Sequence, residues 1–370
     1  MRLGVEAAVI DGQVVAGDVE VVGDRIADVG LASANGRGLA APGFIDLQVN
    51  GFAGLDFLEA DADGYRRAGE GLLETGVTAY LPTFITAPEE DVTAALAQLS
   101  RGASYGKAKN GGPKVLGAHL EGPFMASTRL GTHRASARRD PDPALLERLL
   151  AAGPVRMMTL APELPGAGPL IDLLQVQGVT VSCGHSDANA EIANAAFNRG
   201  VRTVTHLFNA MRPFRHRDPG IVGAALARDD VVVQIIVDGI HLAPETASVI
   251  WRAAAGRVAL VTDAVAGAGM SDGSYSLAGF EIEIQGGVVT GPDGVLAGSA
   301  LTMIEAVRNF HALGVPLPAA LEAASSLPAQ VLGISTTGRL APDLAADVVV
   351  LDDNLEIERV LVAGEARVAA

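Results

Sequence analysis

Eight short runs rich in valine, isoleucine and leucine recur along the middle of the chain, and each run ends in polar residues. The runs span residues 43–51, 77–84, 114–122, 155–163, 179–186, 201–209, 231–239 and 257–265. Most of the intervals hold a stretch rich in Ala, Leu, Glu and Arg, as in residues 142–153 and 188–200. Alternation of buried strands with helices predicts a (β/α)8 barrel, an α/β fold of the TIM type. After the eighth run, residues 274–294 predict a β-hairpin, and helices over 299–313 and 318–332 close the barrel.

The two chain ends share a different pattern. From Leu3 to about Leu39, short apolar runs alternate with Asp-Gly, Gly-Asp and Asn-Gly turns, and the same texture returns after Gly338. Such spacing is typical of short antiparallel strands. We therefore expect residues 1–42 and 338–370 to pair into one discontinuous β-sandwich domain beside a catalytic barrel domain of residues 43–337.

Composition narrows the class of protein. Of 370 residues, 49% are hydrophobic and 19% charged, which fits a compact enzyme and excludes a disordered or fibrous chain. The net charge of -16, without a long Lys/Arg run, argues against a nucleic-acid partner. The sequence offers no stretch of roughly 18 apolar residues, so we expect no membrane association. The single cysteine, Cys183, excludes an internal disulfide, and the first residues lack the apolar core of a signal peptide, which predicts a cytoplasmic protein.

Ionisable residues stand at four of the predicted strand ends: Glu121, His185, His206 and Asp263. Barrel enzymes carry their chemistry at the carboxyl ends of the strands, so these side chains should converge. One carboxylate and two imidazoles suit a divalent transition metal such as zinc or iron. A single histidine there is more often structural, but two at successive ends, with a glutamate two ends earlier, favour a metal site.

Asp263 follows the apolar run Val-Ala-Leu-Val-Thr, which places its carboxylate at the barrel mouth. As a general base it would accept a proton from metal-bound water and return a proton to the departing amine. A helix N-cap is the alternative role. Cys183 lies two positions before His185 and points the same way along a strand, but a buried core residue is the favoured interpretation over a ligand.

Residues 211–220 hold three arginines and one histidine in an otherwise acidic chain. They form either a solvated surface loop or a site that binds an anion. In the second case Asn209 and Ala210 would add backbone N–H donors, and the site would favour a phosphorylated substrate. His133 and His241 could polarise a carbonyl or hold hydroxyl groups of a substrate, although core or surface roles fit them equally well.

Nine motifs appear in order between Pro42 and Met303: PGFIDLQVNG, HLEGPF, GTH, GHSDA, THLFNAM, RDPG, DGIH, LVTDA and LAGSALTM. With them the chain resembles the N-acetylglucosamine-6-phosphate deacetylases of the amidohydrolase superfamily over essentially its whole length. The resemblance implies a barrel with a flanking β-sandwich, a homodimer, and hydrolysis of the acetamide of an amino-sugar phosphate to free amine and acetate.

The resemblance also implies roles for individual residues. It makes Glu121, His185 and His206 the metal ligands, Asp263 the general base and acid, and His133 an aid to carbonyl polarisation. It places Asn209, Ala210 and His241 against the sugar phosphate. It places Arg217 on the phosphate of the substrate bound by the neighbouring subunit.

One departure from the superfamily pattern concerns the number of metal ions. Many amidohydrolases carry His-x-His at the end of the first strand, and here that place reads Gln48-Val49-Asn50. Amides are poor metal ligands, so we expect one divalent ion per subunit, zinc or iron. Gln48, Asn50, His119 and Asp46 are then candidates to support the ligands without touching the ion.

Two other functions compete with this assignment. The chain could be an amidohydrolase for a different N-acyl or cyclic amide. The arginine-rich loop argues against this function, because it favours a substrate with a phosphate. It could also be a catalytically inactive barrel used for binding or assembly. The complete set of candidate metal ligands and base argues against this second function.

Overall fold

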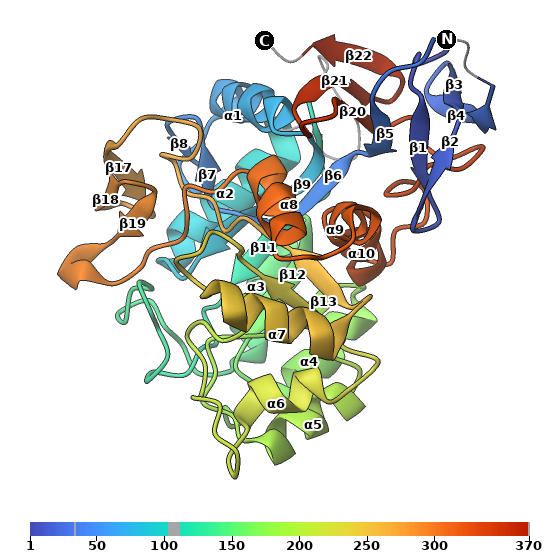
Figure 1. Ribbon diagram of the computed structural model, residues 1–370. Coiled ribbons are helices and arrows are strands. Elements are labelled where there is room, and N and C mark those ends of the chain that lie inside the picture. The colour runs from blue at the N-terminus through green and yellow to red at the C-terminus, as the bar shows by residue number, and fades with distance from the viewer. Residues whose placement is uncertain (33–34, 103–111, 369–370) are drawn as a thin grey trace.

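A computed structural model of the chain describes residues 1–32, 35–102 and 112–368, and its centre is a barrel of parallel strands (Figure 1). Eight strand positions surround the axis, as the sequence predicts: β6 (Phe44–Val49), β9 (Val77–Ile85), β11 (Ala118–Glu121), β12 (Val155–Leu160), β13 (Thr180–Cys183), β14 (Thr203–Val204), β15 (Val232–Ile235) and β16 (Val258–Leu260). β6 pairs with β9, and the order then runs from β9 through β11 to β16. Every residue of β6, β9 and β11 is buried, as expected for strands covered on both faces.

The third predicted strand is interrupted. A short strand β10 (Lys114–Val115) pairs with the beginning of β9, and β11 pairs with the end of β9. Gly117 lies between them with a φ of +123°, and a Cβ there would come within 2.9 Å of the carbonyl oxygen of Pro154. The close approach of the neighbouring backbone therefore requires a glycine and a break at this position.

The barrel closes between its first and last strands through loop backbone beyond β16. The N–H of Asp263 donates to the carbonyl of Gln48 at 2.9 Å, and the N–H of Asn50 donates to the carbonyl of Ala264 at 2.7 Å. Three of the residues that make these bonds, Gln48, Asn50 and Asp263, are polar residues that the sequence singles out at the barrel mouth.

Helices pack around the strands, and several of them begin at a side-chain cap. Asp61, Asp142 and Asn189 each accept a backbone N–H of the helix that follows. The helices are α1 (Ala62–Glu74), α2 (Glu89–Gly102), α3 (Pro143–Ala152), α4 (Ala167–Val176), α5 (Ala190–Asn198), α6 (Gly220–Leu226), α7 (Pro244–Ala254), α8 (Met303–Ala312), α9 (Leu317–Ala323) and α10 (Ser326–Val331).

The last predicted helix, residues 318–332, forms two helices, α9 and α10, instead of one. Pro328 has no N–H to donate to the carbonyl of Ala324, and its ring restricts the preceding turn. Ser325 breaks the helix with φ -136° and ψ -75°.

The two chain ends meet in one mixed sheet, ordered β2-β1-β5-β20-β21-β22. Its strands are β1 (Ala7–Ile10), β2 (Gln13–Ala16), β5 (Leu39–Pro42), β20 (Val348–Leu351), β21 (Ile357–Val362) and β22 (Glu365–Val368). A second sheet of β3 (Asp18–Val22) and β4 (Arg25–Leu31) contributes Val19 and Ile26 to the apolar core that it shares with Val348 and Val350. The antiparallel pairing of β5 with β20 therefore brings the beginning and the end of the chain together.

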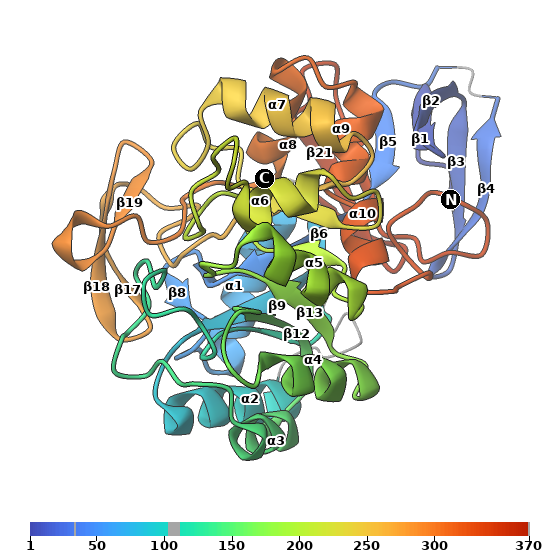
Figure 2. The ribbon, with the colours of Figure 1, turned by 90° about the horizontal axis from the view of Figure 1, so that it is seen from below.

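A small excursion follows the barrel. Strands β17 (Gly273–Leu277), β18 (Phe280–Gln285) and β19 (Val288–Thr290) form a three-stranded antiparallel sheet, followed by a 3-10 turn, η1 (Pro292–Gly294). It lies on the opposite side of the barrel from the terminal sheet (Figure 2). A hairpin of β7 (Gly51–Phe52) and β8 (Leu55–Asp56) follows β6, and Asp56 accepts the N–H of Ala278 from the turn between β17 and β18. Among the described helices, none has the length and apolar character to cross a bilayer.

Candidate metal centre and active-site cleft

Glu121, His185 and His206 come together at the carboxyl ends of β11, β13 and β14. Oε1 of Glu121 lies 3.1 Å from Nε2 of His185 and 2.8 Å from Nε2 of His206, and the two imidazole nitrogens are 3.2 Å apart. All three side chains are buried, and their potential ligand atoms lie within 4.8 Å of one another. The strand-end argument from the sequence thus identifies one compact cluster.

The backbone at this cluster adopts the left-handed region at residues other than glycine. His185, His206 and Asp263 have φ values of +48°, +26° and +51°. L-residues enter this region at a cost in conformational energy, and such residues concentrate at functional sites. The turns after β13, β14 and β16 are therefore shaped to present these side chains inward.

A neighbouring carbonyl orients one of the candidate ligands. Nδ1 of His185 lies 2.8 Å from the carbonyl oxygen of Arg129. Because a carbonyl can only accept a hydrogen bond, the proton of the neutral imidazole belongs on Nδ1, and Nε2 offers its lone pair toward Glu121 and His206. Metal-binding histidines commonly have this arrangement.

The charge of the cluster also suits a cation. Burial alone would raise the pKa of Glu121, but the imidazoles of His133, His185 and His206 around it hold that pKa well below its usual range. For His206, burial acts to lower the pKa, and contact with Glu121 outweighs burial and raises it. The cluster therefore contains a carboxylate that is fully ionised near neutral pH.

The residues present fit a divalent metal. One ionised carboxylate oxygen and two imidazole nitrogens, converging from three strand ends, match the donor types of zinc and of other late divalent ions. Cys183 is not among the converging atoms. It lies in the barrel core, where burial raises the pKa of its thiol.

Gln48 and Asn50 do not reach toward the cluster as ligands but hold Asp263. Nε2 of Gln48 and Nδ2 of Asn50 donate to Oδ1 of Asp263 at 3.0 and 2.7 Å. Burial raises the pKa of Asp263 to about 6, with the negative charge of Glu121 adding to the effect. A cation bound at the cluster would act in the opposite direction.

His133 presents a hydrogen-bond donor toward the cluster. The backbone N–H of Thr86 donates to Nδ1 of His133 at 3.2 Å, so the proton of the neutral ring sits on Nε2, which lies 3.6 Å from Oε2 of Glu121. Burial, together with the nearby His185, lowers the pKa of His133 to about 4. The ring is therefore neutral near pH 7 and carries an N–H that can bind a developing negative charge.

His119 and Asp46 lie beneath the site, inside the barrel. His119 contacts the carbonyl of Leu47 through Nδ1 at 3.0 Å and the hydroxyl of Thr159 through Nε2 at 2.7 Å, and burial lowers its pKa to about 4. Asp46 accepts the hydroxyl of Thr262 at 2.6 Å, and burial raises its pKa to about 7. Both side chains support the strand ends from below.

A cleft of about 320 Å³ opens above the cluster. Its walls include Asn209, Ala210 and His241, and the Nδ1 atom of His241 is held by Asp238 at 2.7 Å. Arg217 is exposed and is not among the residues that line the cleft of its own chain.

An apolar wall of the cleft was not expected from the sequence. Ile85, Leu277, Val295 and Leu296 line it beside Asp263. Three of them belong to the excursion after the barrel or to the segment that follows it, and the hairpin pattern there indicated strands but not which part of the barrel they would cover.

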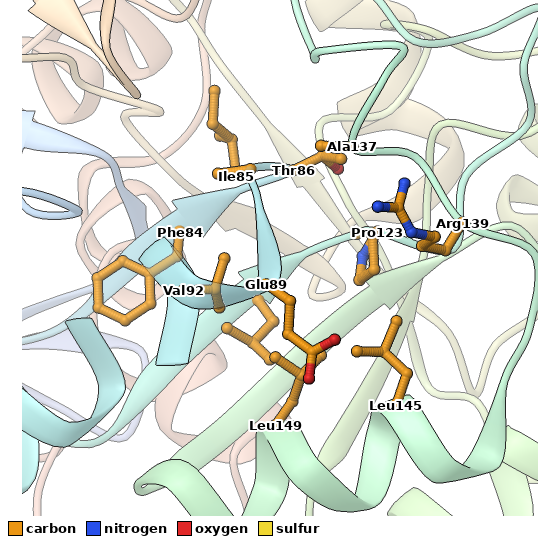
Figure 3. Close-up of a pocket in the computed structure, with 13 residues that line it drawn as sticks. Phe84, Ile85, Thr86, Glu89, Val92, Pro123, Ala137, Arg139, Leu145 and Leu149 are labelled. Atoms are coloured by element: carbon orange, nitrogen blue, oxygen red, sulfur yellow. The ribbon is translucent and has the colours of Figure 1, made fainter. Parts of the chain in front are cut away.

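A second, smaller cavity lies between β9, α2 and α3. Figure 3 shows Val92 of α2 and Leu145 and Leu149 of α3 projecting into it, with Glu89 and Arg139 at its edge. It is mainly apolar, has room for little more than one water molecule, and contains none of the predicted site residues. It is a packing space behind the turn that follows Glu121.

Comparisons with known proteins agree with this geometry. The amidohydrolase family matches residues 39–367. The chain is similar to N-acetylglucosamine-6-phosphate deacetylases from Mus musculus, with 40% identity over 92% of this chain and 86% of the relative, and from Danio rerio, with 41% identity over 88% and 84%. An N-acetylgalactosamine-6-phosphate deacetylase from Escherichia coli O157:H7 is 37% identical over 88% and 87%.

Solved structures match over the full length. A mutant N-acetyl-D-glucosamine-6-phosphate deacetylase from Mycobacterium smegmatis, in complex with N-acetyl-D-glucosamine-6-phosphate, superposes with a TM-score of 0.92 and 34% identity, covering 99% of this chain and 98% of that chain. The Thermotoga maritima N-acetylglucosamine-6-phosphate deacetylase has a TM-score of 0.91 and 30% identity, with 99% of each chain covered.

Proposed function

The chain belongs to the amidohydrolase family, and from that membership we propose that it hydrolyses N-acetylglucosamine 6-phosphate to glucosamine 6-phosphate and acetate. The observation that carries the proposal is the shared cleft, in which Asp263 and His133 face the buried Glu121, His185 and His206 cluster. A relative of the same fold has been solved in complex with this substrate.

The chemistry divides between the ion and the side chains. A divalent cation held by Glu121, His185 and His206 would lower the pKa of bound water and polarise the acetamide carbonyl. We assign general base catalysis to Asp263, whose second carboxylate oxygen, Oδ2, accepts the proton of the attacking water. Asp263 then donates this proton to the departing nitrogen, so that the C–N bond breaks and acetate and the free amine leave.

His133 stabilises the charge that develops during attack. The carbonyl oxygen becomes negative as the tetrahedral centre forms, and the Nε2–H of His133 can donate to it. Since the low pKa of His133 keeps the ring neutral, it acts as a hydrogen-bond donor and need not lose a proton.

Recognition of the phosphate completes the proposal. Asn209, Ala210 and His241 line the cleft, and among its described lining residues none is a lysine or an arginine. Following the resemblance to the deacetylases, we assign Arg217, on the exposed loop, to the phosphate bound by a second subunit, which would make a homodimer the active form. Amidohydrolysis of a different N-acyl or cyclic amide remains the competing function.

An acetate-release assay tests the substrate. We expect acetate from N-acetylglucosamine 6-phosphate, far less from unphosphorylated N-acetylglucosamine, and none after the metal has been removed with a chelator. N-acetylgalactosamine 6-phosphate belongs in the same assay, because one relative carries that name. Acetate release that is indifferent to the 6-phosphate would overturn the sugar-phosphate assignment, and full activity in the chelator would overturn the metal.

Subunit mixing tests the shared site. Arg217→Ala should raise the KM for the phosphorylated substrate, while Asp263→Asn should lower turnover by about 100- to 10,000-fold. If each site combines Asp263 of one subunit with Arg217 of its partner, mixed dimers contain one intact site. At substrate concentrations far below the KM of Arg217→Ala, an equal mixture should then recover about a quarter of wild-type activity. Failure of the mixture to recover activity, with dimers exchanging normally, contradicts the shared site.

A further inference from the structure

The loop of residues 125–133, called here the Arg129 loop, lies directly against His185. The N–H of Ala126 donates to the carbonyl of His185 at 3.0 Å, and the carbonyl of Arg129 accepts from Nδ1 of His185 at 2.8 Å. The same loop continues into Gly131, Thr132 and His133, which line the cleft. Its position therefore affects both a candidate metal ligand and the candidate carbonyl-polarising group.

The side chain of Arg129 ties its loop to the carboxylate of Asp187. Oδ1 of Asp187 accepts hydrogen bonds from Nε of Arg129 at 2.9 Å and from a terminal guanidinium nitrogen of Arg129 at 2.6 Å. Asp187 follows His185 by two residues, so the guanidinium of Arg129 reaches back to the segment whose imidazole its own carbonyl orients. Arg129 therefore contacts this segment twice: its side chain binds Asp187 and its carbonyl binds His185.

Asp187 is itself fixed on its other sides. Glu163 accepts the backbone N–H of Asp187 and the hydroxyl of Ser186, the latter at 2.7 Å. Arg212 approaches Oδ2 of Asp187 at 3.3 Å, and Nε of Arg212 is 3.0 Å from each carboxylate oxygen of Asp218. Asp187 is thus the point at which the Arg129 loop, the turn after β13 and the arginine-rich loop meet.

We propose that Asp187 is a positioning residue for the metal centre: by binding Arg129, it holds the carbonyl that fixes the proton of His185 on Nδ1 and directs Nε2 to the ion. The inference rests on the proposed metal site. Asp187 is neither among the clustered ligands nor among the residues that line the cleft, so its effect should appear first as metal affinity. Groups that orient metal-binding histidines commonly change affinity by about 10- to 100-fold when they are removed.

Zinc affinity of the purified full chain tests the inference. The apparent dissociation constant is measured by competition with a chromophoric chelator, for the wild type, Asp187→Asn and Arg129→Met. We expect each variant to bind zinc about 10-fold or more weakly than the wild type. The double variant should lose no more zinc affinity than either single variant, because both substitutions remove the same contact between Arg129 and Asp187. The melting temperature of each metal-free protein is recorded alongside, to show that the fold is retained.

Asp218→Asn is the matched control. Its side chain is 37% exposed against 36% for Asp187, and it binds Arg212, but it does not contact Arg129. We expect this variant to keep wild-type zinc affinity.

The outcomes are distinct. If Asp187→Asn binds zinc within about twofold of the wild type, the inference is wrong while the proposed metal site stands. If Asp187→Asn does not fold, Arg129→Met decides in its place by the same criterion. An equal loss of zinc affinity in Asp218→Asn would also contradict the inference. It would show that removing either acidic partner of Arg212 weakens zinc binding, whether or not that partner contacts Arg129. A wild type that binds no zinc overturns the proposed metal site and the inference together.

Discussion

Gln48 and Asn50 hold the carboxylate of Asp263 through one oxygen, Oδ1, and this arrangement separates two tasks within a single side chain. The amide donors fix the orientation of the group. Among the described residues, Oδ2 has no hydrogen-bond partner, so it is the oxygen that can exchange a proton with water or substrate. Burial raises the pKa of Asp263 to about 6, and a cation bound at the cluster would oppose this shift, so the proposed base is ionised near neutral pH.

Asp263→Asn separates the base from the metal site. Asp263 is not among the three clustered ligands, so the variant should bind as much metal as the wild type. Without a base, turnover should fall by about 100- to 10,000-fold. Metal analysis and acetate release on the same preparation check both parts. Turnover within about tenfold of the wild type would refute the assigned base.

At this scale the sequence predicts which residues meet but not how they are held. Glu121, His185 and His206 stand at recognisable strand ends, so their convergence follows from barrel topology. The pairing of Gln48 with Asp263 depends on a contact between residues 215 positions apart, and no local pattern reports it. The left-handed backbone at His185 and Asp263 is equally hidden, because these residue types do not require it as a turn glycine does.

At the scale of elements, the β17–β18–β19 sheet is tied to the barrel through a buried carboxylate. Asp56, at the end of β8, accepts the N–H of Leu58 at 2.9 Å and the N–H of Ala278 in the turn between β17 and β18. That sheet also places Leu277 in the cleft wall. The sequence indicates the strands of the excursion, but its attachment to the barrel depends on Asp56, which lies more than 200 residues earlier.

Asp56 should make stability depend on pH. Burial raises its pKa from 3.8 to about 6, although the two backbone hydrogen bonds act to lower it. A raised folded-state pKa means that the neutral carboxyl is preferred in the fold. Its stabilising contribution is complete below about pH 4 and is lost as the pH rises through about 6, a change of about 3 kcal/mol.

Urea unfolding of the wild type and Asp56→Asn at pH 4 and pH 7 measures this effect. The stability of the wild type relative to the variant should fall by about 2–3 kcal/mol between the two values, because Asn cannot ionise. Taking the difference between the two proteins cancels the titration of every group that they share. A difference that stays constant across this range contradicts the assignment.

At the scale of the whole molecule, one buried ion pair links the barrel to the terminal sheet. Nζ of Lys114, in β10, lies 2.6 Å from Oδ2 of Asp347, whose side chain is fully buried. Asp347 also accepts the hydroxyl of Thr337 at 2.8 Å and the N–H of Ala363 at 2.9 Å. The sequence predicts that the two chain ends pair, and the structure adds this connection between the sheet and the barrel. The division into domains at residues 42 and 338 stays a prediction.

Asp347→Ala should be strongly destabilising, by about 3–5 kcal/mol, because it leaves the partly buried Lys114 without its partner. The control is Asp230→Ala. Asp230 pairs with Arg228 at 2.8 Å but is 45% exposed, so its loss should cost less than about 1 kcal/mol. Urea unfolding of both variants compares their free energies of unfolding. Similar losses of stability would contradict the prediction that the ion pair between barrel and sheet contributes more than an exposed pair.

The pairing of β5 with β20 also has a consequence for how the polypeptide emerges from the ribosome. Roughly 300 residues separate the two strands, so at about 5–20 residues per second β5 waits about 15–60 seconds for its partner. Throughout that interval Ala8 and Ala40 lack Val348 and Val350, which share their apolar core in the finished protein. The nascent strands β1 and β5 are therefore open to chaperone binding during this interval, and the terminal sheet cannot be completed until β20 has been synthesised.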